Sequence, residues 1–205
     1  MHGRDDSLCM KCLRASCLYP SLCVNLVFDH SPLVELYKKC EKVPGVKKIF
    51  ISSGVRYDLL LCGSEDERKK YSCYVYANKL ITGHVSGRLK VAPEHTSSRV
   101  LKLMRKPPYD LFLKFKKLFD KISESAGLKQ QIVPYFISSH PGSELDDMAE
   151  LAVETAEEGF RLEQVQDFTP TPMTLSSVIY YCGFNPYTGE TVYSAKSKKD
   201  RDEQR

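Results

Sequence analysis

Four cysteines lie within the first 23 residues of the chain, at Cys9, Cys12, Cys17 and Cys23. Their order, C-x2-C-x4-C-x5-C, places four sulfur atoms in one short segment. Thiolates bind zinc, softer metals and iron–sulfur clusters, and a tetrahedral site needs four ligands from nearby loops. The cysteines therefore predict a metal or iron–sulfur site, without separating iron–sulfur from zinc. A disulfide clip and thiols that only contribute to packing are the alternatives.

Polar residues that follow two expected strands form a second group of candidates. Ser53 and Arg56 come after the first strand, and the planar guanidinium of Arg56 suits an anionic group such as a carboxylate. Glu94 and His95 come after the second strand and could serve as general acid or base, or hold a ligand hydroxyl. An ordinary turn with a surface arginine explains the first pair, and a structural role explains the second equally well.

A third candidate follows the next expected strand, where His140, Pro141 and Gly142 precede a helix. Backbone amides at the start of a helix can face a ligand, which is the functional interpretation of this turn. A tight turn without any ligand is the alternative. The sequence contains no Walker lysine loop, GxGxxG, GxSxG or HExxH motif that would indicate another chemistry.

Alternating strands and helices must position these residues. Short apolar runs predict strands at residues 46–51, 88–92, 131–137 and 162–168. Helical spacing predicts a helix that begins at 31 and a mixed helical region that ends at about 80. It predicts further helices that begin at 97 and after 108, and helices over 143–158 and 175–181. In the helix that follows Pro108, Phe112, Phe115, Phe119 and Ile122 share one apolar face. In the 143–158 helix, Ser143 and Asp146 predict a capping box.

The expected fold class is α/β, a partial (βα) barrel with parallel strands and about four βα units, preceded by a Cys-rich segment. Strands that alternate with helices pair in parallel, and their carboxyl ends carry the site. A closed eight-fold barrel needs about 250 residues, more than the 205 present. The predicted divisions are a Cys-rich segment at 1–28, the barrel part at 29–190 and a charged, fraying tail at 191–205.

Composition excludes several classes of protein. The chain is 42% hydrophobic and 27% charged, as in ordinary globular domains, and its net charge of +4 gives little indication of nucleic-acid binding. It contains no run of 18 apolar residues, and its first residues do not resemble a secretory signal, so we expect no membrane association. Eight cysteines in a chain of this length favour a reducing, cytoplasmic location.

Several segments resemble radical S-adenosylmethionine enzymes, and more closely the YgiQ-like members of that family. The segments that resemble strands and a helix of radical S-adenosylmethionine enzymes are RLKVAPEHT at 88–96, VLKLMRK at 100–106 and PYFISSHPGS at 134–143. The YgiQ-like resemblance lies in CLRASCLYPSLC at 12–23, DHSP at 29–32, SGVRYD at 53–58 and QVQDF at 164–168. The similarity runs from about Cys9 to Pro186.

The resemblance implies a [4Fe-4S] cluster with one open iron, S-adenosyl-L-methionine and its cleavage to a 5′-deoxyadenosyl radical. It implies cofactor contacts from residues at the ends of successive strands, namely Ser53, Arg56, Glu94, His140, Pro141, Gly142 and Thr169. It also implies a reductant such as flavodoxin or ferredoxin, and leaves the substrate open.

One departure from the family pattern limits these expectations. The C-x3-C-x2-C motif that holds the radical cluster in that family does not occur here, and the resemblance places it upstream. The cysteines from Cys9 to Cys23 are then an auxiliary iron–sulfur or zinc site. The chain is expected to be the C-terminal half of such an enzyme's core and inactive alone. A non-catalytic zinc- or cluster-binding module and a protein-interaction domain are the alternatives.

Overall fold

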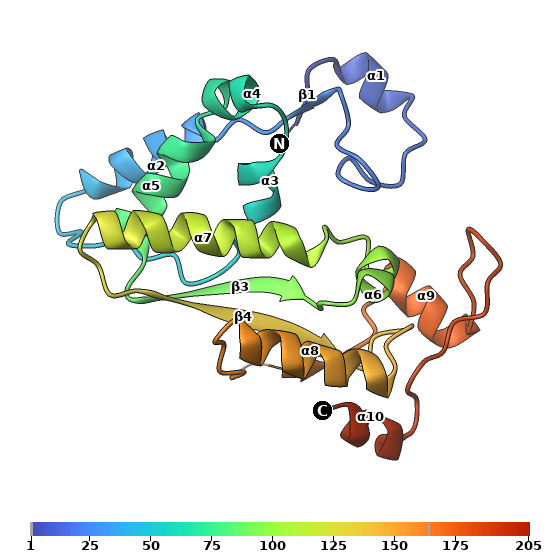
Figure 1. Cartoon of the computed structure of the whole chain (residues 1–205). Helices are drawn as coiled ribbons and strands as arrows, with labels where there is room; N and C mark the ends of the chain where they lie inside the picture. The colour runs from blue at the N-terminus through green and yellow to red at the C-terminus, as the bar shows by residue number, and fades with distance from the viewer. Residues whose placement is uncertain (1, 164) are drawn as a thin grey trace. The chain divides into compact units, whose positions relative to one another are not determined.

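The computed structural model describes residues 2–163 and 165–205 (Figure 1). These residues form two compact units. The first contains the chain up to Leu89 together with Leu111–Ile132, and the second contains Lys90–Asp110 together with Val133–Arg205. None of the helices within the described ranges is long and apolar enough to cross a lipid bilayer.

The first unit is mainly helical. Its elements are β1 (His2–Gly3), α1 (Asp6–Met10), β2 (Leu26–Val27), α2 (Ser31–Glu41), α3 (Tyr57–Leu61), α4 (Glu65–Lys70) and α5 (Cys73–His84). Most of α7 (Tyr109–Ser125) also belongs to it. The strands β1 and β2 pair antiparallel, with His2 opposite Val27. The two strands of this small ribbon lie on either side of the four cysteines in the sequence. The sequence analysis did not predict the ribbon.

Aromatic side chains build the core of this first unit. Phe112, Phe115 and Phe119 of α7 are each fully buried, and Ile122 is nearly so, which confirms the predicted apolar face. Tyr57 at the start of α3 packs against this face, with ring centroids 5.7 Å from Phe115. Burying large side chains of this kind contributes about 2 kcal/mol each, so α7 anchors the unit.

The second unit contains a parallel sheet of three strands in the order β3 (Arg88–Glu94), β4 (Gln131–Ser138) and β5 (Val165–Asp167). Figure 1 shows β3 and β4 running in the same direction. The register of the second pair places Phe136 opposite Val165 and Ser138 opposite Asp167. Parallel alignment brings all three carboxyl ends to one edge of the sheet. The predicted α/β class with parallel strands is confirmed.

Helices and turns complete the second unit. They are α6 (Ser98–Leu103), α8 (Leu145–Glu157), α9 (Leu175–Cys182) and α10 (Lys198–Gln204). The predicted helix over 175–181 is therefore confirmed. The predicted strand over 162–168 is confirmed for its central part, while residue 164 lies outside the described residues.

The strand predicted at 46–51 is wrong, because these residues have no regular secondary structure. Its backbone groups bond to the end of α5 instead. The amide of Ile51 donates to the carbonyl of His84 at 2.7 Å, and His84 Nδ1 lies 3.0 Å from the carbonyl oxygen of Ile49. A run of β-branched residues becomes a strand only when a neighbouring strand accepts its hydrogen bonds.

Two further expectations in the second unit need correction. The capping box of α8 is made by Glu144 and Asp147, one residue later than predicted. The buried residues of α8 are Asp147, Met148, Leu151 and Thr155. The charged tail contains the short helix α10, which Ser197 caps by accepting a hydrogen bond from the amide of Asp200 at 3.0 Å.

Candidate functional site

The turn that follows β3 holds a strained glutamate. Glu94 has a backbone φ of 72°, a left-handed conformation that costs a residue with a side chain about 1–3 kcal/mol. Its side chain is only 12% exposed, and its Oε1 accepts a hydrogen bond from Lys106 Nζ at 2.8 Å. The ion pair therefore joins the end of β3 to the segment after α6.

His95, the next residue, is fully buried and stabilises the same turn. Its Nδ1 accepts hydrogen bonds from the amides of Thr96 at 2.9 Å and Ser97 at 3.0 Å. The proton of the neutral ring then resides on Nε2, which lies 3.4 Å from Ser143 Oγ. Burial lowers the pKa of His95 to about 4. The residue is a neutral structural contact between the turns that follow β3 and β4.

His140 follows β4 and is also neutral. Its Nδ1 donates to the carbonyl oxygen of Pro141 at 2.8 Å, so its Nε2 accepts from Ser176 Oγ, also at 2.8 Å. Burial lowers the pKa of His140 to about 4, against the opposing effect of the Pro141 hydrogen bond. Because the hydroxyl hydrogen of Ser176 points to the ring, the lone pairs of its oxygen can accept a bond from a ligand.

Gly142 ends this turn in a conformation that requires glycine. Its φ is 86°, and a side-chain Cβ at this position would collide with Leu103 Cδ1 of α6. Pro141 beside it is buried. The turn thus packs against the Leu103 side chain of α6, where the absence of a Cβ leaves room for it.

The end of β5 supplies a carboxylate. Asp167 Oδ1 accepts from Ser138 Oγ at 2.9 Å and from Arg205 Nε at 3.2 Å, and Arg205 Nη2 contacts the other oxygen. Burial alone would raise the pKa of Asp167, but the hydrogen bonds from Arg205 and Ser138 lower it. The carboxylate is therefore ionised and paired at neutral pH. Thr169, two residues further, is exposed.

These turns surround a cleft of about 320 Å³ in the second unit, which we call the strand-edge cleft. Its charged lining residues are Glu94, Lys106 and Asp167. Its hydroxyl-bearing lining residues, apart from tyrosine, are Thr169, Thr171, Thr174 and Ser176. Its apolar and aromatic walls include Met104, Tyr135, Ile137 and Phe168. A volume of this size fits a small organic ligand or a nucleoside.

The charges of the cleft cancel in pairs. Glu94 is bound to Lys106, Asp167 is bound to Arg205, and His140 is neutral. A ligand in the cleft therefore meets hydroxyl groups, apolar walls and carboxylates that are each paired with a basic side chain. Such a surface suits a ligand part that is neutral, carries several hydroxyl groups and has an aromatic or apolar body.

The structure brings some of the predicted residues together. Glu94, His140 and Thr169 all line the strand-edge cleft, while Pro141 and Gly142 shape the turn beside His140. Ser53 and Arg56 belong to the first unit. There Arg56 forms an ion pair with Asp58, with Nε 2.9 Å from Oδ1, and Ser53 is exposed.

The four cysteines of the N-terminal segment are free thiols, three of them exposed and Cys23 half-buried. Within the described part of the chain, no three His, Cys, Asp or Glu side chains are placed to hold a metal ion. Cys9 Sγ instead accepts from Asn25 Nδ2 at 3.1 Å, and the amide of Arg14 donates to Cys12 Sγ at 3.4 Å. The metal assignment of these cysteines stays a prediction.

Several site residues were missed by the sequence analysis. Asp167 could have been found by applying the strand-end rule to the last strand, as was done for the others. Lys106 lies 12 residues from its partner Glu94, and Ser176 lies 36 residues from its partner His140. No short motif connects either pair. Arg205 lies 38 residues from Asp167 within a segment that has no apolar periodicity.

No family model matches the chain. The chain is similar to curated proteins that carry the name UPF0313 protein. It is 56% identical, over its full length, to one from Bacteroides thetaiotaomicron, and 54% identical over 98% of its length to one from Porphyromonas gingivalis. A protein of the same name from Pseudomonas putida is 44% identical over 93% of the chain.

These relatives are much longer than the chain. The matched region makes up 33% of the Bacteroides protein, 32% of the Porphyromonas protein and 24% of the Pseudomonas protein. The chain therefore spans a third or less of the length of the curated relatives it matches. Its strand-edge cleft lies in a sequence homologous to part of the UPF0313 proteins.

Proposed function

We propose that this chain forms part of a radical S-adenosylmethionine enzyme, and that the strand-edge cleft binds the nucleoside part of S-adenosylmethionine. The observation that supports the proposal most is the electrically balanced, hydroxyl-lined cleft at the carboxyl ends of three parallel strands. The resemblance of residues 88–106 and 134–143 to radical S-adenosylmethionine enzymes supports it independently, because those residues contribute two of the three strand ends.

The donor and acceptor groups of the cleft fit a nucleoside. Thr169, Thr174 and Ser176 offer hydroxyl groups to a ribose, and Phe168 with Ile137 offers an apolar surface to a purine. His140 orients Ser176 by accepting a hydrogen bond from its hydroxyl group, so the lone pairs of the Ser176 oxygen can accept a hydrogen bond from a ribose hydroxyl. When S-adenosylmethionine is bound beside a reduced iron–sulfur cluster, it supplies a 5′-deoxyadenosyl radical.

The residues present do not fit the iron–sulfur cluster itself. The thiols of the N-terminal segment do not converge in this structure, and the C-x3-C-x2-C motif is absent from the sequence. We therefore assign no step of the reaction to this chain's cysteines. In the proposal, the longer protein supplies the radical cluster, and flavodoxin or ferredoxin supplies the electron.

Two parts of the proposal rest on the sequence alone. Ser53 and Arg56 are proposed as further cofactor contacts because of the SGVRYD resemblance. Cys9, Cys12, Cys17 and Cys23 are proposed to hold an auxiliary iron–sulfur cluster or a zinc ion, which requires their segment to close around the metal.

Calorimetric titration of the chain with adenosine tests the nucleoside site. Ser176→Ala and Thr169→Val each remove one hydroxyl from the cleft, and the loss of one hydrogen bond should weaken binding about three- to tenfold. Thr188→Val is the matched control, because Thr188 is exposed and contacts Glu190 outside the cleft. If the unsubstituted chain and the three variants bound adenosine with equal affinity, the cleft would not be the nucleoside site.

A reaction assay tests the proposed chemistry. With dithionite and S-adenosylmethionine, the Bacteroides relative with a reconstituted cluster should release 5′-deoxyadenosine, whereas the present chain should release none. The relative is about three times as long as the chain. Release by the short chain would mean that its own cysteines hold the radical cluster, and no release by the relative would contradict the assigned reaction class.

A further inference from the structure

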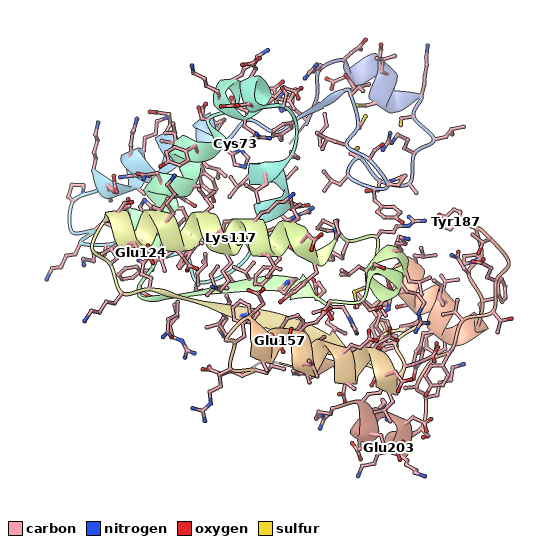
Figure 2. All side chains as sticks on the ribbon, viewed as in Figure 1. Cys73, Lys117, Glu124, Glu157, Tyr187 and Glu203 are labelled. Carbon is pink, nitrogen blue, oxygen red and sulfur yellow. The ribbon has the colours of Figure 1, made fainter. Side chains whose placement is uncertain are left out.

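The C-terminal residues contact the turns of the strand-edge cleft at several positions. We call residues 193–205, which include α10, the C-terminal clamp. At its start, the carbonyl oxygen of Tyr193 accepts from the amide of Gly142 at 2.7 Å. At its end, Gln204 and Arg205 reach the turns that follow β4 and β5. Glu203, labelled in Figure 2, marks the position of α10.

Gln204 holds the turn after β4 from both sides. Its side chain is almost completely buried, at 4% exposure for the residue. Its Oε1 accepts from the amide of Ser139 at 3.0 Å, and its Nε2 donates to the carbonyl oxygen of Ser143 at 2.9 Å. A buried amide with both ends paired is favourable, whereas the same amide without partners would destabilise the fold.

The turn held by Gln204 needs such support. Ser139 has a φ of 58° and Gly142 a φ of 86°, so two of its residues are in the left-handed region. Conformations of this kind persist when the surrounding structure fixes them. The support is mutual, because α10 has seven residues without an apolar stripe and is too short to be stable by itself.

Arg205 joins the C-terminal clamp to the end of β5. Its guanidinium pairs with the carboxylate of Asp167, which lines the cleft. The clamp therefore contacts residues at the ends of both β4 and β5.

We propose that Gln204 is a positioning residue for the turn Ser139–Ser143, which contains His140 of the strand-edge cleft. This function rests only on the observed contacts.

Hydrogen exchange of the full chain tests Gln204. Gln204→Leu removes both hydrogen bonds, and exchange at the amide of Ser139 should accelerate about tenfold. Gln204→Glu keeps the Oε1 acceptor, so the Ser139 amide should stay protected in that variant. Lys199→Gln, on the exposed side of α10, is the control and should change neither. Unchanged exchange at Ser139 in Gln204→Leu would overturn the positioning role.

Discussion

The Cys-rich segment and the strand-edge cleft differ in how their chemical groups are held. In residues 2–28, large apolar side chains such as Met10 and Leu13 are 89% and 101% exposed, and three of four thiols face solvent. At the strand edge, His95 and His140 are 0% and 2% exposed, and their ring nitrogens contact neighbouring groups. The thiols of the first region are mostly exposed and are not held by packed side chains, whereas the histidines of the second region are buried and hydrogen-bonded.

This difference shows what sequence spacing can and cannot indicate. Four close cysteines are conspicuous in a sequence, but a metal site also needs the chain around them to bring the sulfur atoms together. The strand-edge residues form no recognisable motif by spacing, yet parallel strands bring their turns together without any further requirement. The organised site of the free chain is therefore the strand-edge cleft.

The largest expected effect is the pH dependence of stability. His95 and His140 have pKa values lowered to about 4 by burial, against about 6.5 in an unfolded chain. Between those values the unfolded chain binds more protons, so stability is full above pH 6.5 and is lost as the pH falls toward 4. The loss should be on the order of 3 kcal/mol for each histidine.

Urea unfolding at pH 7, 5.5 and 4.5 measures this loss. His140→Gln should reduce the slope of unfolding free energy against pH, since one of the two groups no longer takes up a proton. A slope that is the same in His140→Gln and the unsubstituted chain would mean that this histidine is not held neutral, which would weaken the contrast between the two regions.

Crowding at the strand edge should give the next largest effect. Gly142→Ala places a Cβ against the end of the Leu103 side chain, which must shift, in addition to the strain of its positive φ, so we expect a loss of about 2 kcal/mol in the free energy of unfolding. Gly159→Ala is the matched control, with a φ of 74° and open space around the added atom, and should cost about 1 kcal/mol. Equal losses would show that the turn after β4 is not tightly packed on α6.

The ion pair at the cleft should contribute less. Lys106→Gln leaves Glu94, whose side chain is 12% exposed, without its partner. Because Lys106 itself is 43% exposed, solvent screening limits the expected loss to about 1 kcal/mol. Lys199→Gln breaks the pair of Lys199 and Glu203 on the surface of α10, and thermal unfolding should detect almost no change there. A larger loss of stability in Lys199→Gln than in Lys106→Gln would contradict the expected difference between the two ion pairs.

The smallest effect on stability is expected in the Cys-rich segment. Without metal, Cys12→Ala and Cys17→Ala should change the free energy of unfolding by less than about 0.5 kcal/mol, because both side chains are exposed. After anaerobic incubation with iron and sulfide, or with zinc, the same variants should contain less metal than the unsubstituted chain, whereas Cys182→Ala should not. Iron–sulfur binding would also colour the protein and zinc would not. Equal metal content in all proteins would leave the cysteines without a metal role.

Local patterns predicted those parts of the fold that depend on neighbours in sequence. The face of Phe112, Phe115, Phe119 and Ile122 follows from helical spacing, and the strand ending at Ser138 follows from its apolar run. The strand expected at 46–51 failed because strand formation depends on a partner, and its backbone bonds to the end of α5 instead.

The unpredicted parts of the site depend on contacts between distant residues. Gln204 lies 65 residues from Ser139 and 61 from Ser143, and a charged segment gives no sign of such contacts. Glu94, His140 and Thr169 could be placed near one another because each follows a parallel strand. The pairing of charges at the cleft became visible only when the side chains were placed in space.

We expect the strand-edge cleft, and not the Cys-rich segment, to bind the nucleoside part of S-adenosylmethionine. Titration of the isotope-labelled chain with S-adenosylmethionine, followed by amide chemical shifts, distinguishes the two regions. Binding at the cleft should give saturable shifts at Thr169, Thr174 and Ser176 and leave residues 2–28 unchanged. Saturable shifts confined to residues 2–28, or no saturable shift at the cleft, would exclude the cleft as the nucleoside site.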